Sequence, residues 1–346
     1  MVTGNIGKWE IAKNASTEFV PLSVADMEFP TARPIVESIK KLAEEAILGY
    51  TNPTQEYYDA VISWMKRRHD FEIKKEWLLQ TPGIINALSM LIETVTAPGD
   101  GVIVMPPVYY PFDMTIIATG RRSVFCPLIN KDGRYEIDFD LLEEKAKDSG
   151  NTAIIFCNPH NPIGQVWSRE DVERVCEICA KNNVTLISDE IHADLRMRGV
   201  SFTSTGPIAR ERGTKCISCY APSKTFNIPG LASSFAVTLD EGLRTRFQTF
   251  MEAGEFSSVD RSLDQRVLIY CEVDAFLTEL CSHLIGLGYS ESQIVNCYDR
   301  SGFFKFSLDL VDDDLFSFLC FYRHYFSFPA ISLRLVLSCR YKYPAS

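Results

Sequence analysis

The chain has 346 residues, of which 46% are hydrophobic and 23% charged, and its formal net charge is −10. This composition is typical of a folded globular protein and excludes a disordered or fibrous one, and the length predicts about two domains. An acidic chain does not attract phosphate backbones through its overall field, so nucleic acid is not an expected partner. The basic run 66–69 is the best local exception, and we expect it to be a solvated helix face.

No apolar run reaches the roughly 18 residues that a membrane-spanning helix needs, and residues 1–10 lack the apolar core of a secretion signal. We therefore expect a cytoplasmic protein without a membrane partner, in which the 11 cysteines are reduced thiols. The pairs Cys176/Cys179 and Cys216/Cys219 have the spacing of a zinc site, but they lie in a helical and a strand-like pattern. Because a four-thiolate site needs short loops instead, we expect no metal.

Loop-like residues 21–34 open the chain, followed by two helices near 35–47 and 55–69. Short apolar runs then alternate with helical stretches. The runs that predict strands are 101–105, 152–157, 184–188, 215–220 and 233–238, and helical patterns between them include 140–147 and 169–182. This alternation predicts a mainly parallel sheet covered on both faces. In such a sheet the ligand lies beyond the carboxyl ends of the strands.

The alternation weakens after about Gly242, which predicts a change of domain. We expect residues 49–255 to form a large domain with the sheet. Residues 1–48 would be an N-terminal segment contributing to a small domain, which residues 256–346 complete in a divergent or short form.

Two turns carry polar groups that suit a ligand. In the segment 81–88 a glycine turn opens a helix, where free N–H groups and the helix dipole favour an anion such as phosphate. In the segment 158–164 two prolines and a glycine constrain a turn that presents Asn161 at a strand end. Each segment is by itself also compatible with an ordinary turn.

Two ionisable residues follow predicted strands. Asp189 comes directly after an apolar run, where a carboxylate can hold a proton on a ligand nitrogen or cap a helix. Lys224 stands among apolar and small residues. A desolvated lysine there loses basicity and can form a Schiff base, although most lone lysines are surface residues. Anion cradle, asparagine, carboxylate and amine together match the needs of pyridoxal 5'-phosphate (PLP).

With these motifs in this order, the sequence resembles the fold-type I PLP-dependent class I/II aminotransferase family, in its cystathionine β-lyase-like (C–S lyase) branch. The resemblance extends from about Lys8 to Glu255. The motifs that carry it are Val24–Pro30, Gly49–Thr51, Pro106–Phe112, Asn158–Gly164, Ser188–Leu195 and Ala221–Leu231. It implies an α/β fold: a large domain with a mainly parallel seven-stranded sheet between helices, and a smaller α+β domain, here divergent or truncated.

The resemblance implies a role for each matched residue. Lys224 forms the Schiff base with PLP and later moves the proton, and Asp189 pairs with the pyridine nitrogen. Asn161 would bond the phenolic oxygen, Tyr109 would stack on the ring face, and His192 is a further implied cofactor contact. The implied phosphate contacts are the Ser223 hydroxyl, the backbone of Gly83, Ile84 and Ile85, and Tyr50, which would reach the phosphate of a neighbouring subunit. The contact from Tyr50 implies a homodimer with shared active sites.

Two departures from the transaminase pattern favour the lyase branch. His192 stands where many transaminases carry a tyrosine, and Ala232 stands where many carry a phosphate-binding arginine. The implied reaction is cleavage of cystathionine or a related cysteine S-conjugate, an amino-acid substrate, to a thiol, pyruvate and ammonia. An aminotransferase reaction uses the same residues and remains an alternative.

The family pattern fades after about Ser257. There Arg334 matches the arginine that holds the substrate carboxylate in a bidentate pair, but Val336 replaces the asparagine that the family places two residues later. A non-catalytic protein of the same fold, or a truncated product, is therefore a second alternative.

Overall fold

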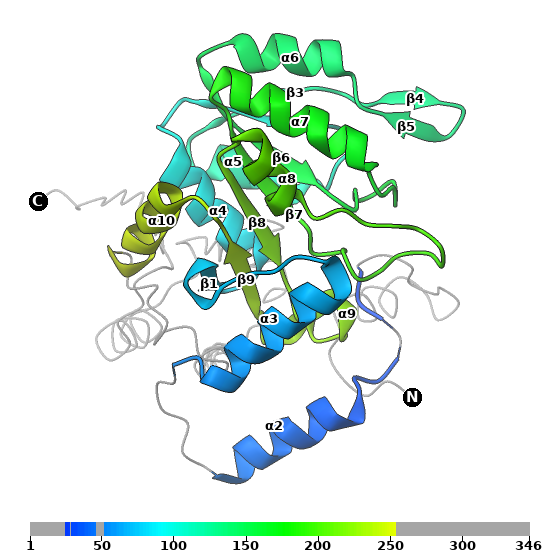
Figure 1. Ribbon diagram of the computed structural model, residues 1–346, viewed down its shortest axis with the longest axis vertical. Coiled ribbons are helices and arrows are strands. Elements are labelled where there is room, and N and C mark those ends of the chain that lie inside the picture. Colours follow the sequence, from blue (N-terminus) through cyan, green and yellow to red (C-terminus); the bar gives the residue numbers. More distant parts are fainter. Residues whose placement is uncertain (1–24, 28, 46–51, 254–346) are drawn as a thin grey trace, which may run out of the picture. The chain divides into compact units, whose positions relative to one another are not determined.

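The computed structural model describes residues 25–27, 29–45 and 52–253 (Figure 1). All of them fall within the first of the chain's two structural units, residues 1–268. The expectations for Tyr50, Arg334 and the segment 256–346 lie outside the described residues. In the described part of the chain, no helix is long and apolar enough to cross a membrane.

A seven-stranded sheet organises these residues, in the order β1-β9-β8-β7-β6-β2-β3. Its strands are β1 (Leu78–Thr81), β2 (Gly101–Val104), β3 (Arg122–Phe125), β6 (Asn151–Cys157), β7 (Thr185–Asp189), β8 (Cys216–Tyr220) and β9 (Ser234–Val237). The five adjacent strands β8, β7, β6, β2 and β3 pair in parallel, whereas β9 is antiparallel to both β8 and β1. The expected mainly parallel seven-stranded sheet is thus confirmed.

The topology brings several chain segments to one edge of the sheet. Because β9 runs against both of its neighbours, β1 points the same way as β8. The carboxyl ends of β1, β2, β6, β7 and β8 therefore meet at the same edge. The amino end of β9 lies there too, since Thr81 pairs with Ser234.

Two helical layers cover the sheet (Figure 1). Helices α4 (Ile84–Val95), α5 (Pro111–Ala118) and α10 (Glu241–Ala253) pack on one face, and α6 (Phe139–Lys147), α7 (Arg169–Asn182) and α8 (Thr205–Arg212) pack on the other. Successive strand residues alternate between the two cores: Ile154 belongs to the second and Ile155 to the first. The continuous apolar runs reflect this burial on both faces.

The cysteine pairs lie in the elements that the sequence predicts. Cys176 and Cys179 are buried on α7, and Cys216 and Cys219 on β8 face opposite cores. Within the described ranges, no three side chains of His, Cys, Asp or Glu are grouped to hold a metal ion.

The remaining elements lie before β1, between β3 and α6, and after β8. They are α2 (Arg33–Glu45), α3 (Gln55–His69), η1 (Lys75–Trp77), β4 (Ile129–Lys131), β5 (Arg134–Glu136), α9 (Pro222–Thr225) and η2 (Pro229–Leu231). The expectation of a solvated basic face at the end of α3 is wrong for His69, whose side chain is only 1% exposed. Its ring contacts the rings of Phe202 and Tyr220.

Candidate active site

The expected cofactor contacts that the structure describes come from segments at one edge of the sheet. Strand β7 ends at Asp189, and Asn161 lies in the turn that follows β6. The short helix α9, which follows β8, carries Ser223 and Lys224. The parallel register places Asp189 directly between Cys157 of β6 and Cys219 of β8.

Asp189 is a buried carboxylate, 3% exposed, on the face of the sheet that α4 and α5 cover. Its strand neighbours are thiols, which are weak hydrogen-bond donors. Burial raises the pKa of Asp189 to about 7, against the hydrogen bond from the Ile191 N–H and the charge of Lys224. A ligand atom that brings a positive charge would stabilise this carboxylate in its ionised form.

Lys224 is half-buried on α9, and the loss of water lowers its pKa. The negative charges of Asp26 and Asp189 oppose this effect in part. The pKa of His192 falls to about 4, mainly because the ring is buried and additionally because of the Lys224 charge. Lys224, Asp189 and His192 therefore form one electrostatic cluster, with a neutral imidazole beside an amine that loses its proton more easily than a free lysine.

An asparagine brings Asp26 to this cluster from the N-terminal segment. The side-chain amide of Asn227 accepts a hydrogen bond from the Met27 N–H at 2.9 Å and donates one to the Met27 carbonyl at 3.2 Å. A second bond from the amide reaches the Phe29 carbonyl at 2.7 Å. The sequence motifs contained Asp26 and Asn227, but sequence reasoning assigned a role to neither.

Tyr109 lies between β2 and α5 and packs edge-on against Phe112, with ring centroids 5.7 Å apart. Burial raises the pKa of its phenol, and the charges of Tyr110 and Asp189 add to the shift. Its hydroxyl therefore stays protonated at neutral pH. The contribution from Asp189 places Tyr109 in the same cluster.

A buried histidine joins the loops of Tyr109 and Asn161. His160 Nε2 donates a hydrogen bond to the Pro107 carbonyl at 3.0 Å, and its ring lies edge-on to Trp167. Because burial lowers the pKa of His160 to about 4, the ring is neutral and this contact is structural. The density of prolines pointed to a constrained turn, but no sequence signal indicated this link.

The start of α4 has the geometry of an anion cradle. Gly83 has a φ of 85°, and a Cβ added there would lie 3.5 Å from the Ala232 carbonyl oxygen. Ala232, the position of the missing arginine, therefore lies beside the helix terminus. The first N–H groups of a helix have no partner within it, so Gly83, Ile84 and Ile85 can hold an anion.

Glu190 is a buried acid to which sequence reasoning gave no role. It is 1% exposed and accepts hydrogen bonds from the hydroxyls of Ser188, Ser204 and Tyr220 and from the N–H of Thr205. These contacts join the ends of β7 and β8 to the start of α8. Strand alternation alone could have placed Glu190 on the opposite face from Asp189.

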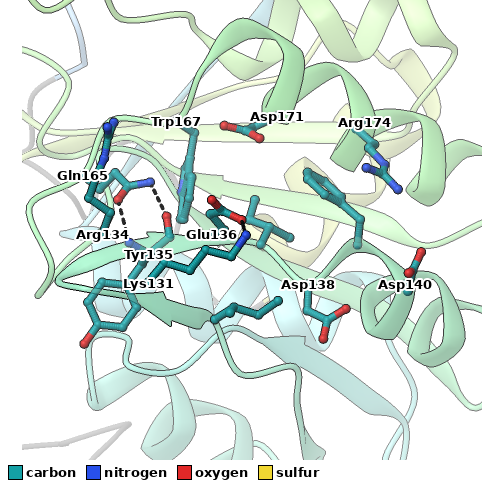
Figure 2. Close-up of a pocket in the computed structure, with 13 residues that line it drawn as sticks. Lys131, Arg134, Tyr135, Glu136, Asp138, Asp140, Gln165, Trp167, Asp171 and Arg174 are labelled. Atoms are coloured by element: carbon teal, nitrogen blue, oxygen red, sulfur yellow. Dashed lines mark hydrogen bonds and ion pairs between the residues drawn. The ribbon is translucent and has the colours of Figure 1, made fainter.

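A separate cleft lies beside the β4–β5 hairpin (Figure 2). There the Gln165 amide bonds both backbone groups of Tyr135, and Lys131 pairs with Glu136. Asp138 caps α6 in the wall of the same cleft. None of the expected cofactor contacts lines this cleft, and these paired groups serve to hold the hairpin in place.

The comparisons with known proteins agree on one family. A family model described as aminotransferase class I and II matches residues 17–261. The cystathionine beta-lyase PatB of Bacillus subtilis (strain 168) is 42% identical over 236 residues, 68% of this chain and 61% of the relative. The chain thus spans about three fifths of the length of this curated relative.

Two solved structures are similar in fold as well as in sequence. Cystalysin from Treponema denticola, which contains a PLP cofactor, has a TM-score of 0.71 and 40% identity over 78% of this chain and 71% of its own. The PLP-bound C–S lyase from Staphylococcus hominis has a TM-score of 0.68 and 33% identity over 82% of this chain and 73% of its own.

We predict that the raised pKa of Asp189 makes the ligand-free protein less stable as pH increases. An unfolded aspartate has its ordinary pKa near 3.8, so between about pH 4 and pH 7 the folded state binds more protons. The melting temperature of the wild type should therefore fall across this range relative to that of Asp189→Asn. If the melting temperatures of the two proteins changed with pH in the same way, the burial of this carboxylate would be contradicted.

Proposed function

The chain belongs to the class I and II aminotransferase family, and we propose that it is a PLP-dependent C–S β-lyase. Its substrate would be cystathionine or a related cysteine S-conjugate, cleaved to a thiol, pyruvate and ammonia. The cluster of Lys224 and Asp189 at the sheet edge carries this proposal. The similarity to a named cystathionine beta-lyase supports the choice of substrate.

The groups at the sheet edge fit PLP. The buried carboxylate of Asp189, with its raised pKa, suits a protonated pyridine nitrogen, which would supply the missing positive charge. Lys224 suits an aldehyde, and the N-terminus of α4 with Ser223 suits a phosphate. The residue beside Gly83 is Ala232, which has a short side chain. We also propose that Tyr109 contacts the ring face of PLP and that Asn161 bonds its phenolic oxygen.

When bound, PLP supplies an electron sink for a carbanion at the substrate Cα. The protein's part is to place and move protons. Lys224 Nζ, with its lowered pKa, is suited to take the proton from the substrate Cα and to pass it to the sulfur that leaves from Cβ as the thiol. Asp189 would keep the ring nitrogen protonated, and the neutral His192 adds no competing charge next to Lys224.

We also propose that the protein is a homodimer. Tyr110, Met114 and Ile117 form an exposed apolar stripe along α5, with exposures of 73%, 59% and 60%. The stripe begins next to Tyr109, and an apolar surface of this kind is expected to be covered. A second copy would cover it and bring its own Tyr50 to the phosphate.

We also propose the bounds of the domains and the cellular compartment of the protein. We propose residues 49–255 as the large domain, since all seven strands of the sheet fall within them. Residues 1–48 and 256–346 would contribute to the small domain, where Arg334 would bind the substrate carboxylate. The buried free thiols are compatible with a reducing compartment, so we propose the cytoplasm, which cell fractionation would check.

Replacement of the lysine tests the cofactor assignment. We expect Lys224→Ala to lose the visible absorbance band that PLP gives when bound to a lysine, because no other amine of the cluster can replace it. Turnover should fall by at least about 100-fold. The control is Lys215→Ala, which removes an exposed lysine bonded to Asn183 and should keep the band. Retention of the band in Lys224→Ala would refute the assignment.

The reaction type is tested with L-cystathionine and PLP in the absence of any 2-oxo acid. We expect pyruvate and ammonia to accumulate in equal amounts, since β-elimination needs no amino acceptor. A requirement for an added 2-oxo acid would instead indicate an aminotransferase. A bound PLP whose spectrum responds to no amino acid would indicate the non-catalytic alternative.

The dimer is tested by sedimentation velocity. We expect Met114→Asp and Ile117→Asp to shift the wild-type dimer to a monomer, because each would bury an unpaired charge in the interface. Ile129→Asp is the matched control, since Ile129 is an exposed apolar residue on the β4–β5 hairpin. A monomeric wild type, or a dimer that all three variants retain, would count against this interface.

A further inference from the structure

A second carboxylate, five residues after Asp189, connects the loop that follows β7 to two helices. Asp194 has a side chain only 11% exposed. Its Oδ2 accepts hydrogen bonds from the Trp64 indole N–H and from the Thr225 hydroxyl, both at 3.0 Å. Its Oδ1 lies 3.4 Å from Arg68 Nε and 3.3 Å from His69 Nε2.

These contacts divide into two groups by their place in the fold. Trp64, Arg68 and His69 stand on the last two turns of α3, whereas Thr225 stands on α9. Thr225 directly follows Lys224 in the chain. A single carboxylate therefore joins the long helix α3 to the four-residue helix that carries the lysine.

The contacts around Asp194 make it a strong acceptor. Bonds from His69, Trp64 and Thr225 keep its pKa below the ordinary value although burial acts in the opposite direction. Hydrogen bonds to an ionised carboxylate are shorter and stronger than those between neutral groups. Thr225 therefore donates to a charged acceptor, at a distance of 3.0 Å.

Contacts next to Lys224 also tie helix α9 to α3. It has one turn, closed by the bond from the Phe226 N–H to the Pro222 carbonyl. The Trp64 ring packs on Phe226, with centroids 5.2 Å apart, and the Arg68 guanidinium lies 5.4 Å from the Trp64 ring. The two residues that follow Lys224 therefore meet the same part of α3, Thr225 through Asp194 and Phe226 directly.

We propose that Asp194 is a positioning residue: through Thr225 it fixes α9 against α3 and so sets the direction in which Lys224 extends. The inference rests on the proposed function of Lys224. Asp194 itself would touch neither substrate nor cofactor. Its effect would be felt in the chemical step, because a small misplacement of a reacting group slows the reaction more than it weakens binding.

The test removes a contact of Asp194 with α9 and a contact of Asp194 with α3 in separate variants. Thr225→Val deletes the hydroxyl with little change of shape and breaks only the link to α9, and Thr225→Ser restores the hydroxyl. Trp64→Phe deletes the indole N–H, one of the three contacts of Asp194 with α3, while Arg68 and His69 keep theirs and an aromatic ring stays against Phe226. Each variant is made in the 346-residue chain, and the melting temperature without PLP records its general loss of stability.

The first readout is hydrogen exchange of the PLP-free protein. The amides of Phe226 and Ile228 are bonded to carbonyls of α9, so they report on its opening. We expect exchange in this segment to be about tenfold faster in Thr225→Val, and close to wild type in Thr225→Ser and Trp64→Phe. Equal exchange in Thr225→Val and Thr225→Ser would overturn the inference, whether or not the chain binds PLP.

The second readout is turnover of L-cystathionine with PLP. We expect kcat of Thr225→Val to fall by about 10- to 100-fold with KM little changed, and Thr225→Ser to recover most of it. If kcat of Thr225→Val fell only in proportion to the drop in its melting temperature, as it would in Trp64→Phe, the Thr225 contact would be purely structural and the inference would be wrong. If the wild type itself formed no lysine-bound PLP band, the proposed function would fail, while the exchange measurement would still decide the inference.

Discussion

The site depends on a carboxylate that is buried before any ligand arrives. Asp189 ends a central strand between two cysteines, with helices packed on its face of the sheet. Burying an ionised group costs free energy unless a partner compensates. Here Lys224 and one backbone N–H compensate only in part, as the raised pKa shows. The folded chain therefore holds a carboxylate that favours a cationic ligand atom at that point.

The carboxylate of the next residue, Glu190, is instead compensated by groups of the protein itself. Glu190 is equally buried but receives four hydrogen bonds from its own chain. Strand alternation sends the two carboxylates to opposite faces of the sheet, so Glu190 joins parts of the structure while Asp189 faces the site that we propose for PLP. A half-buried lysine with a lowered pKa completes the ligand side. Asp194 links the short helix of this lysine to α3.

Much of this arrangement could be predicted from the sequence, for physical reasons that differ between elements. The central strands are buried on both faces, so they appear as uninterrupted apolar runs. Strand β3 has intermediate and exposed residues only, and the β4–β5 hairpin has strands of three residues, so neither leaves such a run. Strand β1 is short and directly precedes the glycine turn, and for this reason sequence reasoning recognised only the turn.

The sequence by itself determined the family, the central strands of the sheet and the residues that follow them, because hydrophobic period and motif order are local properties of the chain. Only the tertiary structure decided which polar groups meet. Asn227 contacts Met27 across 200 residues, and Thr225 and Trp64 share Asp194 although they lie in distant segments. The shifted pKa values of Asp189 and Lys224 likewise arise from burial and neighbouring charges, which depend on packing and not on the order of residues.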